Sequence, residues 1–298
     1  MRTALHTVSY AGVWPGQVAL PLARVIEKAA EFGFDGVMVM AKRPHASPLD
    51  LDAAERRRLR DLLETHGIEM ACLAGYTDFC GGVERPDVPF REMQILYVTE
   101  LARLAHDLGG SRVRLFTGFP REGISYDLQW NRCVQAIKEC ARRAADYGVT
   151  LGVQNHHDLA AHYESLCDFL AEVDEPNCKA MFDAWAPALQ GCDLVVAARR
   201  LAPLTVQTTV ADYVRRPRFR YLPSLVNYER ELDLVRAVPM GEGFIDYAAF
   251  LGALREGGFD GTVAYEMCSP LQGGGSEANL DRCARRFCDW MREHGFVA

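Results

Sequence analysis

The sequence has no apolar stretch of the roughly 20 residues that a membrane-spanning helix needs. Residues 1–10 also lack the basic segment and apolar core of a secretory signal. These absences predict a cytoplasmic protein with no membrane partner. An excess of basic charge is missing too, because the formal net charge is -7 over 298 residues. Nucleic acid binding draws on clustered Lys and Arg, so we expect no DNA or RNA partner.

The ten cysteines contain no Cys-x-x-Cys pair. A disulfide framework is typical of much shorter secreted chains. We therefore expect reduced, mostly buried thiols.

Short β-type runs alternate eight times with segments of helical periodicity. The expected strands are Thr3–Ser9, Asp35–Met40, Ile68–Ala74, Arg112–Phe116, Thr150–Gln154, Lys179–Phe182, Leu204–Thr209 and Thr262–Glu266. The expected helices are Leu20–Phe32, Leu51–His66, Phe90–Leu108, Asp127–Tyr147, Tyr163–Val173, Asp193–Arg200, Tyr247–Glu256 and Ser276–His294. A glycine suited to a left-handed C-cap follows each of the first four helices, namely Gly33, Gly67, Gly109 and Gly148. No GxGxxG follows the first strand, so the pattern predicts an α/β protein with a single (β/α)8 TIM-barrel domain over residues 1–298.

Two connections exceed the usual length of about 12–15 residues for a structureless loop. They are Tyr76–Pro89 after the third strand and Val210–Gly243 after the seventh. The second contains four arginines interleaved with aromatic residues, among them the substrate-binding candidate Arg215. Two interpretations stay open for it: a solvated surface or subunit contact, and a lid that binds an anion or stacks on a sugar.

Acid and amide side chains end four of the expected strands: Gln154, Asp183, Gln207 and Glu266. The carboxyl ends of the strands of a parallel barrel meet at one rim, where active sites lie. Four oxygen donors, two of them carboxylates, are typical ligands of a hard divalent cation. The sequence therefore predicts a Mn²⁺ or Mg²⁺ site formed by these residues.

Other polar and aromatic residues follow strand ends and are candidates for catalysis or substrate binding. His156 and His157 come directly after the fifth strand, and alternation lets only one of them face the centre. Lys42 and His45 follow the second strand, where either suits contact with a hydroxyl or an oxyanion. Trp185 follows Asp183 and suits stacking on a sugar face.

The chain resembles the sugar phosphate isomerase/epimerase family, which consists of xylose isomerase-like TIM barrels. The resemblance lies in residues 151–156, 182–183, 238–247 and 258–266, of which Gly241-Glu242-Gly243 and Gly258-Phe259-Asp260-Gly261 are the most specific. It implies metal binding by Glu, Asp, His and Glu from strands five to eight. These map to Gln154, Asp183, the Gln207 region and Glu266, with Thr209 as the alternative to Gln207.

The residue at the first of these positions bears on the reaction. The resemblance implies two glutamates as exchanging bases, but an amide such as Gln154 cannot abstract a proton at neutral pH. Glu266 and one rim histidine remain for proton abstraction next to a carbonyl, with a metal-stabilised enediolate.

We therefore expect a divalent-metal-dependent isomerase or epimerase of a sugar or keto-sugar. One alternative is a lyase, either a keto-polyol dehydratase or a β-eliminating deglycosidase of a 3-keto glycoside acting with a partner subunit. A second is a metal-free binding or scaffolding subunit. The expected partner is a small sugar, and the expected assembly is a homo-oligomer, with a hetero-oligomer as the alternative.

Overall fold

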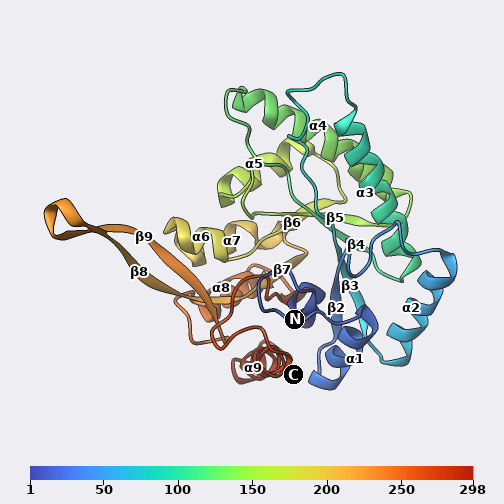
Figure 1. Ribbon diagram of the computed structural model, residues 1–298. Coiled ribbons are helices and arrows are strands. Elements are labelled where there is room, and N and C mark those ends of the chain that lie inside the picture. The colour runs from blue at the N-terminus through green and yellow to red at the C-terminus, as the bar shows by residue number, and fades with distance from the viewer. Residues whose placement is uncertain (298) are drawn as a thin grey trace.

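The computed structural model describes residues 1–297, in which eight parallel strands form a barrel (Figure 1). The strands are β1 (Arg2–His6), β2 (Gly36–Met40), β3 (Glu69–Ala74), β4 (Arg112–Leu115), β5 (Thr150–Gln154), β6 (Cys178–Met181), β7 (Gln207–Val210) and β10 (Thr262–Tyr265). Their hydrogen-bonded order is β6, β5, β4, β3, β2, β1, β10, β7. The backbone N–H of Val206 donates to the carbonyl of Ala180 at 3.0 Å, which nearly closes the barrel between β6 and β7. The predicted TIM barrel is confirmed.

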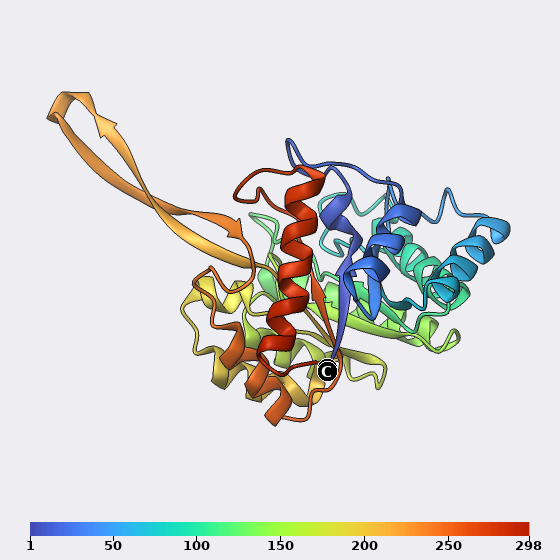
Figure 2. The ribbon, with the colours of Figure 1, turned by 90° about the horizontal axis from the view of Figure 1, so that it is seen from below.

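Helices surround the barrel, as Figures 1 and 2 show. They are α1 (Leu22–Phe32), α2 (Ala53–Thr65), α3 (Phe90–Asp107), α4 (Tyr126–Ala145), α5 (Tyr163–Val173), α6 (Trp185–Gln190), α7 (Leu194–Leu201), α8 (Tyr247–Glu256) and α9 (Glu277–Glu293). Short 3-10 turns lie at Thr7–Tyr10, Ala202–Leu204 and Pro223–Leu225. Gly33 ends α1 with a φ of 81°, in the left-handed conformation that the sequence predicted. Helix α6 was not predicted, because it is a short segment directly after β6.

Small and sulfur-containing side chains fill the barrel interior: Ala4, Met38, Ala71, Cys72, Ala74, Met181 and Ala264. A much larger apolar core lies between the sheet and the helices. All ten cysteines are free thiols, seven of them buried and three half-buried, as predicted. No helix in residues 1–297 has the length and apolar character that crossing a membrane requires.

The connection after β7 is a two-stranded antiparallel hairpin, formed by β8 (Asp212–Leu222) and β9 (Asn227–Val238). The sequence predicted a long connection here but not its two strands. Arg218 and Arg220 pair across the hairpin with Glu231 and Glu229. The hairpin projects away from the barrel in both views, so we call it the arm (Figures 1 and 2).

Candidate functional site

Two cavities lie at the carboxyl ends of the barrel strands and share three lining residues, His156, Glu266 and Cys268. The first has a volume of about 270 Å³ and is also lined by Gln154, Asp183, Trp185, Thr209, Ala211, Tyr213, Val235, Tyr247 and Ser269. The second has a volume of about 450 Å³ and is also lined by Val8, Val13, Lys42, Tyr76, Thr77, Asp78, Gln94, Arg114, Phe116, Phe119 and His157. Together they form the candidate site, at the rim where catalytic residues of TIM barrels lie.

A chain of hydrogen bonds crosses the floor of the first cavity. Gln154 ends β5, and its Nε2 donates to Oδ2 of Asp183 at 2.7 Å and to the hydroxyl of Thr209 at 2.9 Å. The backbone N–H of Trp185 donates to the other carboxylate oxygen of Asp183 at 3.1 Å. Burial raises the pKa of Asp183 to about 7, although the Gln154 hydrogen bond opposes that shift. Asp183 is therefore held by donors on both oxygens.

Arg114, on β4, is one of two cations that line the second cavity, and it is only 1% exposed. Its Nη1 donates to Oε1 of Gln154 at 2.7 Å. Its Cζ lies 4.0 Å from the centroid of the Phe116 ring and 4.9 Å from that of Tyr76. Its Nε and Nη2 are buried and have no hydrogen-bond partner among residues 1–297. No salt bridge joins Arg114 to a carboxylate within this part of the chain.

Glu266 follows β10 and lines both cavities, so its carboxyl group is common to the two halves of the site. It is 9% exposed. Burial raises the pKa of its carboxyl group, and the positive charge of Arg114 partly opposes the shift. A carboxylate with a raised pKa is a stronger base than one in water, once it is ionised.

The two histidines after β5 differ in position. His156 lines both cavities, and its ring centroid lies 5.2 Å from that of Trp185. Burial, together with the charges of His157 and Arg114, lowers the pKa of His156 to about 3, so its imidazole is neutral at pH 7. His157 is exposed and stacks on Phe119 with ring centroids 4.6 Å apart. His156 is thus the histidine that faces the shared part of the site.

Lys42 also reaches the second cavity, where its Nζ lies 3.8 Å from the centroid of the Tyr76 ring. Burial, and secondarily the charge of Arg114, lowers the pKa of Lys42. The lining of this cavity carries two cations, Arg114 and Lys42, and two acids, Asp78 and Glu266, so it offers groups of both charge signs to a strongly polar ligand.

Three residues predicted for the site lie outside it. His45 is in the core, where Nδ1 contacts the Thr7 hydroxyl at 2.9 Å and Nε2 the Leu20 carbonyl at 3.1 Å. Arg215 is exposed on the arm and donates to the carbonyl of Ala188 at 2.9 Å. Gln207 lies deeper in the barrel, with Nε2 3.3 Å from the sulfur of Met38, because its register partner is Thr262 at the start of β10. Neither cavity is lined by any of the three.

Two residues at the centre of the site were not among the main site residues predicted from the sequence. Thr209, the alternative to Gln207, holds the position beside Asp183, with their oxygens 3.3 Å apart. Arg114 was missed altogether. It is a charged residue between Val113 and Leu115 in a short buried strand, and such a placement is a signal because buried charges need a partner.

The Mn²⁺ or Mg²⁺ ion predicted from the sequence can be tested against these donors. Because Arg114 donates to Oε1 of Gln154, the amide must turn its N–H groups, and not its oxygen, toward Asp183. A hydroxyl stands at Thr209, and Gln207 is turned away. Within residues 1–297 no group of three or more His, Cys, Asp or Glu side chains is arranged to hold a metal. The residues present do not fit the predicted ion.

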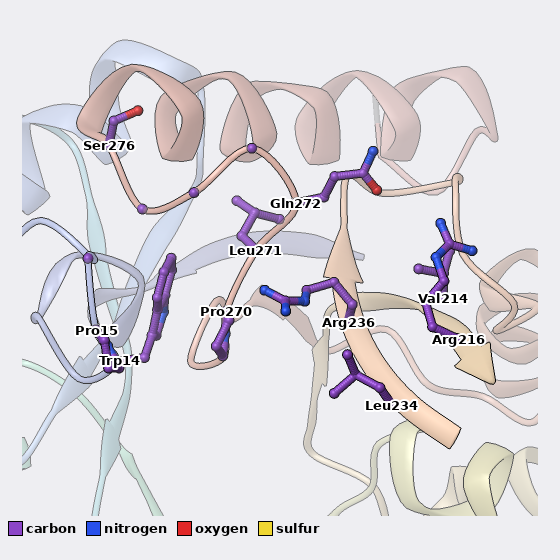
Figure 3. Close-up of a pocket in the computed structure, with 14 residues that line it drawn as sticks. Trp14, Pro15, Val214, Arg216, Leu234, Arg236, Pro270, Leu271, Gln272 and Ser276 are labelled. Atoms are coloured by element: carbon purple, nitrogen blue, oxygen red, sulfur yellow. The ribbon is translucent and has the colours of Figure 1, made fainter. Parts of the chain in front are cut away.

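A larger pocket of about 840 Å³ lies outside the barrel mouth, beside the base of the arm. Trp14 and Pro270 line one side, and Leu234 and Arg236 of β9 line the other (Figure 3). It shares no lining residue with the two cavities of the site, and contains no carboxylate or histidine. The chemistry therefore belongs to the smaller cavities.

Comparison with known proteins gives a consistent result. Residues 26–294 match the sequence model of a family described as xylose isomerase-like TIM barrel. Fructoselysine 3-epimerase from Escherichia coli O157:H7 is 23% identical over 198 residues, which cover 64% of this chain and 68% of that protein.

Two solved structures show the same fold. D-psicose 3-epimerase from Clostridium cellulolyticum H10 aligns with a TM-score of 0.76 and 20% identity, over 98% of this chain and 99% of that one. The probable 3-DHS dehydratase AsbF from Bacillus anthracis, involved in petrobactin synthesis, aligns with a TM-score of 0.72 and 19% identity, over 97% and 99%.

Proposed function

The chain belongs to the xylose isomerase-like TIM barrel family, and we propose that it is an isomerase or epimerase that removes a proton next to the carbonyl group of a sugar or keto-sugar. The epimerases among its relatives support this enzyme class. The observation that carries the proposal is the position of Glu266, a buried carboxylate with a raised pKa that lines both cavities beside His156.

Glu266 acts as the base in this proposal. Its carboxylate takes the proton from the carbon next to the carbonyl, and the electron pair moves to the carbonyl oxygen to give an enediolate. Return of the proton to the neighbouring carbon, together with transfer of the hydroxyl proton between the two oxygens, completes an isomerisation. Delivery of a proton to the same carbon from the face opposite Glu266, by a solvent water, completes an epimerisation.

Three other residues place the substrate. His156, neutral at pH 7, exchanges hydrogen bonds with a substrate hydroxyl. Trp185 lines the first cavity, where its ring suits the apolar face of a sugar. Lys42 lines the second cavity and supplies positive charge to an oxygen of the substrate. The size of the two cavities suits a small carbohydrate.

The experiment is solvent exchange. Ketopentoses, ketohexoses and their phosphates are incubated with the protein in D₂O, and NMR follows deuterium at the carbon next to the carbonyl. We expect exchange with the wild type and at least a ~100-fold slower rate for Glu266→Gln. Glu84→Gln, an exposed acid in the loop after β3, is the control. Exchange that survives in Glu266→Gln contradicts the proposal.

A lyase is the second candidate function. It is favoured because residue 154 is a hydrogen-bonded amide and not a second base. The amide is fixed between Arg114 and Asp183, so the residue at this strand end is not a second base. One base suffices for β-elimination from a keto-polyol or a 3-keto glycoside, because Glu266 removes the proton next to the carbonyl and the β-oxygen leaves with a proton, as water or as the alcohol of the aglycone. The fold shared with the dehydratase AsbF agrees with this candidate. In the same NMR assay an unsaturated product without aldose–ketose interconversion identifies it.

Other features of the proposal rest on sequence reasoning. We propose a cytoplasmic protein that acts on a small carbohydrate and not on nucleic acid. It assembles as a homo-oligomer, or with a partner subunit if the lyase candidate holds. The predicted divalent ion, and the metal-free binding subunit, are alternatives that elemental analysis combined with the exchange assay decides.

A further inference from the structure

One side of the Arg114 guanidinium is hydrogen-bonded within the protein, and the other side is buried but open in the sense that its N–H groups have no acceptor within residues 1–297. Nη1 is engaged by Gln154, whereas Nε and Nη2 have no partner among the described residues. Nε and Nη2 form the edge of a guanidinium that offers two parallel N–H groups. The open side is therefore the side that binds two oxygens at once.

An open guanidinium edge is costly where this one lies. Arg114 is 1% exposed and packs against the rings of Tyr76 and Phe116, so these N–H groups are shielded from bulk water. A buried charge without partners destabilises a fold strongly. Such a group is explained by a ligand that enters the cavity and supplies the acceptors, and Arg114 lines the second cavity.

The chemistry of the open edge defines the ligand. It must be planar, carry two adjacent oxygens and gain negative charge, because a guanidinium fork binds such groups most strongly. The α-hydroxycarbonyl unit of a keto-sugar has two adjacent oxygens. It becomes planar and anionic when it turns into an enediolate.

We propose that the Nε and Nη2 edge of Arg114 binds these two oxygens and stabilises the enediolate, so that a protein cation takes the electrostatic role that the sequence assigned to a divalent metal. The inference rests on the proposed function, since it concerns the same proton abstraction by Glu266. The proton passes to Glu266, the electron pair passes to the carbonyl oxygen, and the charge of that oxygen is balanced by Arg114. No oxidant or reductant takes part.

Gln154 completes the arrangement. Its Oε1 holds Nη1 of Arg114, and its Nε2 is held in turn by Asp183 and Thr209. These contacts fix the plane of the guanidinium before substrate binds, which is the condition for strong stabilisation of a developing charge. Gln154 and Thr209 are thus positioning residues for Arg114.

The test uses a ligand that does not react. Acetohydroxamate ion is planar with two adjacent oxygens and mimics an enediolate. Its binding is measured by isothermal titration calorimetry with the full chain in the presence of a chelator. We expect one equivalent to bind to the wild type without metal.

Variants of Arg114 separate charge from geometry. Arg114→Lys keeps the charge and loses the fork, so we expect binding to weaken roughly 10- to 100-fold. Arg112→Lys, two residues earlier on β4 and outside both cavities, is the matched control and should bind like the wild type. Arg114→Ala leaves room for a small cation, and added guanidinium ion should restore its binding more than ammonium does. Thermal unfolding shows that each variant is folded.

The outcomes divide clearly. Failure of the wild type to bind acetohydroxamate in chelator overturns the inference, as does equal binding by Arg114→Lys. Binding that appears only with added Mn²⁺ also overturns it and supports the metal. Acetohydroxamate binding tests the role of Arg114, and deuterium exchange tests the role of Glu266. Because Glu266→Gln should bind acetohydroxamate and yet lose proton exchange, the proposed function can fail without the inference about Arg114 failing.

Discussion

The side-chain amide of Gln154 donates a hydrogen bond to the carboxylate of Asp183 at 2.7 Å. A carboxylate in place of this amide would remove the donor and bring two like charges together in a buried position. We expect Gln154→Glu to lose roughly 1–3 kcal/mol of stability, measured by urea unfolding. Added Mn²⁺ should raise the melting temperature of this variant and leave that of the wild type unchanged. An equal rise of the wild-type melting temperature on addition of Mn²⁺ would show that the wild type also binds the metal. Gln190→Glu, exposed at the end of α6, is the control.

Gln207 has a different expected response. Its Oε1 is buried without a partner, and its Nε2 faces the sulfur of Met38. Gln207→Met removes the unsatisfied acceptor at similar volume, so we expect stability to be unchanged or up to roughly 1 kcal/mol higher. Deuterium exchange should be retained. A loss of exchange in a folded Gln207→Met protein would restore Gln207 to the list of functional residues.

Asp158 gives a prediction for pH dependence. Burial raises the pKa of its carboxyl group to about 6, although the N–H of Thr117 donates to it at 2.7 Å and opposes the shift. An acid with a raised pKa in the folded state contributes stability that is complete below its unfolded pKa of about 3.9 and is lost as the pH rises through 6.

We therefore expect Asp158→Asn to flatten the stability curve between about pH 4 and pH 6 by roughly 2 kcal/mol. Urea unfolding at several pH values measures this change. Asp87→Asn, at an exposed acid, is the comparison and should leave the slope as it is. Identical slopes for Asp158→Asn and the wild type would show that this carboxyl group is not perturbed.

The arm bears on the expected assembly. A two-stranded hairpin is marginally stable by itself, and this one exposes apolar side chains such as Leu232 at 89% and Val226 at 80%. We expect these side chains to be buried against a second copy of the chain. Leu232→Glu should lower the mass measured by analytical ultracentrifugation. Leu49→Glu, at a position 85% exposed on the barrel, should not. A monomeric wild type would contradict the prediction that the arm packs against a second copy.

The barrel was predictable because its signals are local and repeated. Alternating strands and helices, with glycines such as Gly33 and Gly109 at helix ends, indicate eight β/α units without any long-range information. The arm escaped prediction for a related reason. Its pattern of Arg and Glu has the period of a strand, but both of its faces are exposed, so no apolar stripe marks it as structure.

The candidate site was only partly predictable. Gln154, Asp183 and Glu266 could be placed at one rim because parallel strands end together. The choice between Gln207 and Thr209 depends on the register with β10, which a sequence does not show. The direction of the Gln154 amide depends on Arg114, a residue 40 positions away that donates to it. Without the hydrogen bond from Arg114, the sequence does not show that the amide N–H groups of Gln154, and not its oxygen, face the predicted metal site.

The contact between Gln154 and its neighbours also has a meaning for the history of the barrel. Glutamine and glutamate codons differ only in their first base, so a single point mutation separates this amide from a carboxylate. The residue at position 154, Gln or Glu, would then decide whether the positive charge in the cavity is the guanidinium of Arg114 or a metal ion. An ancestor could cross between the two chemistries without rebuilding a strand, a loop or the packing beneath them.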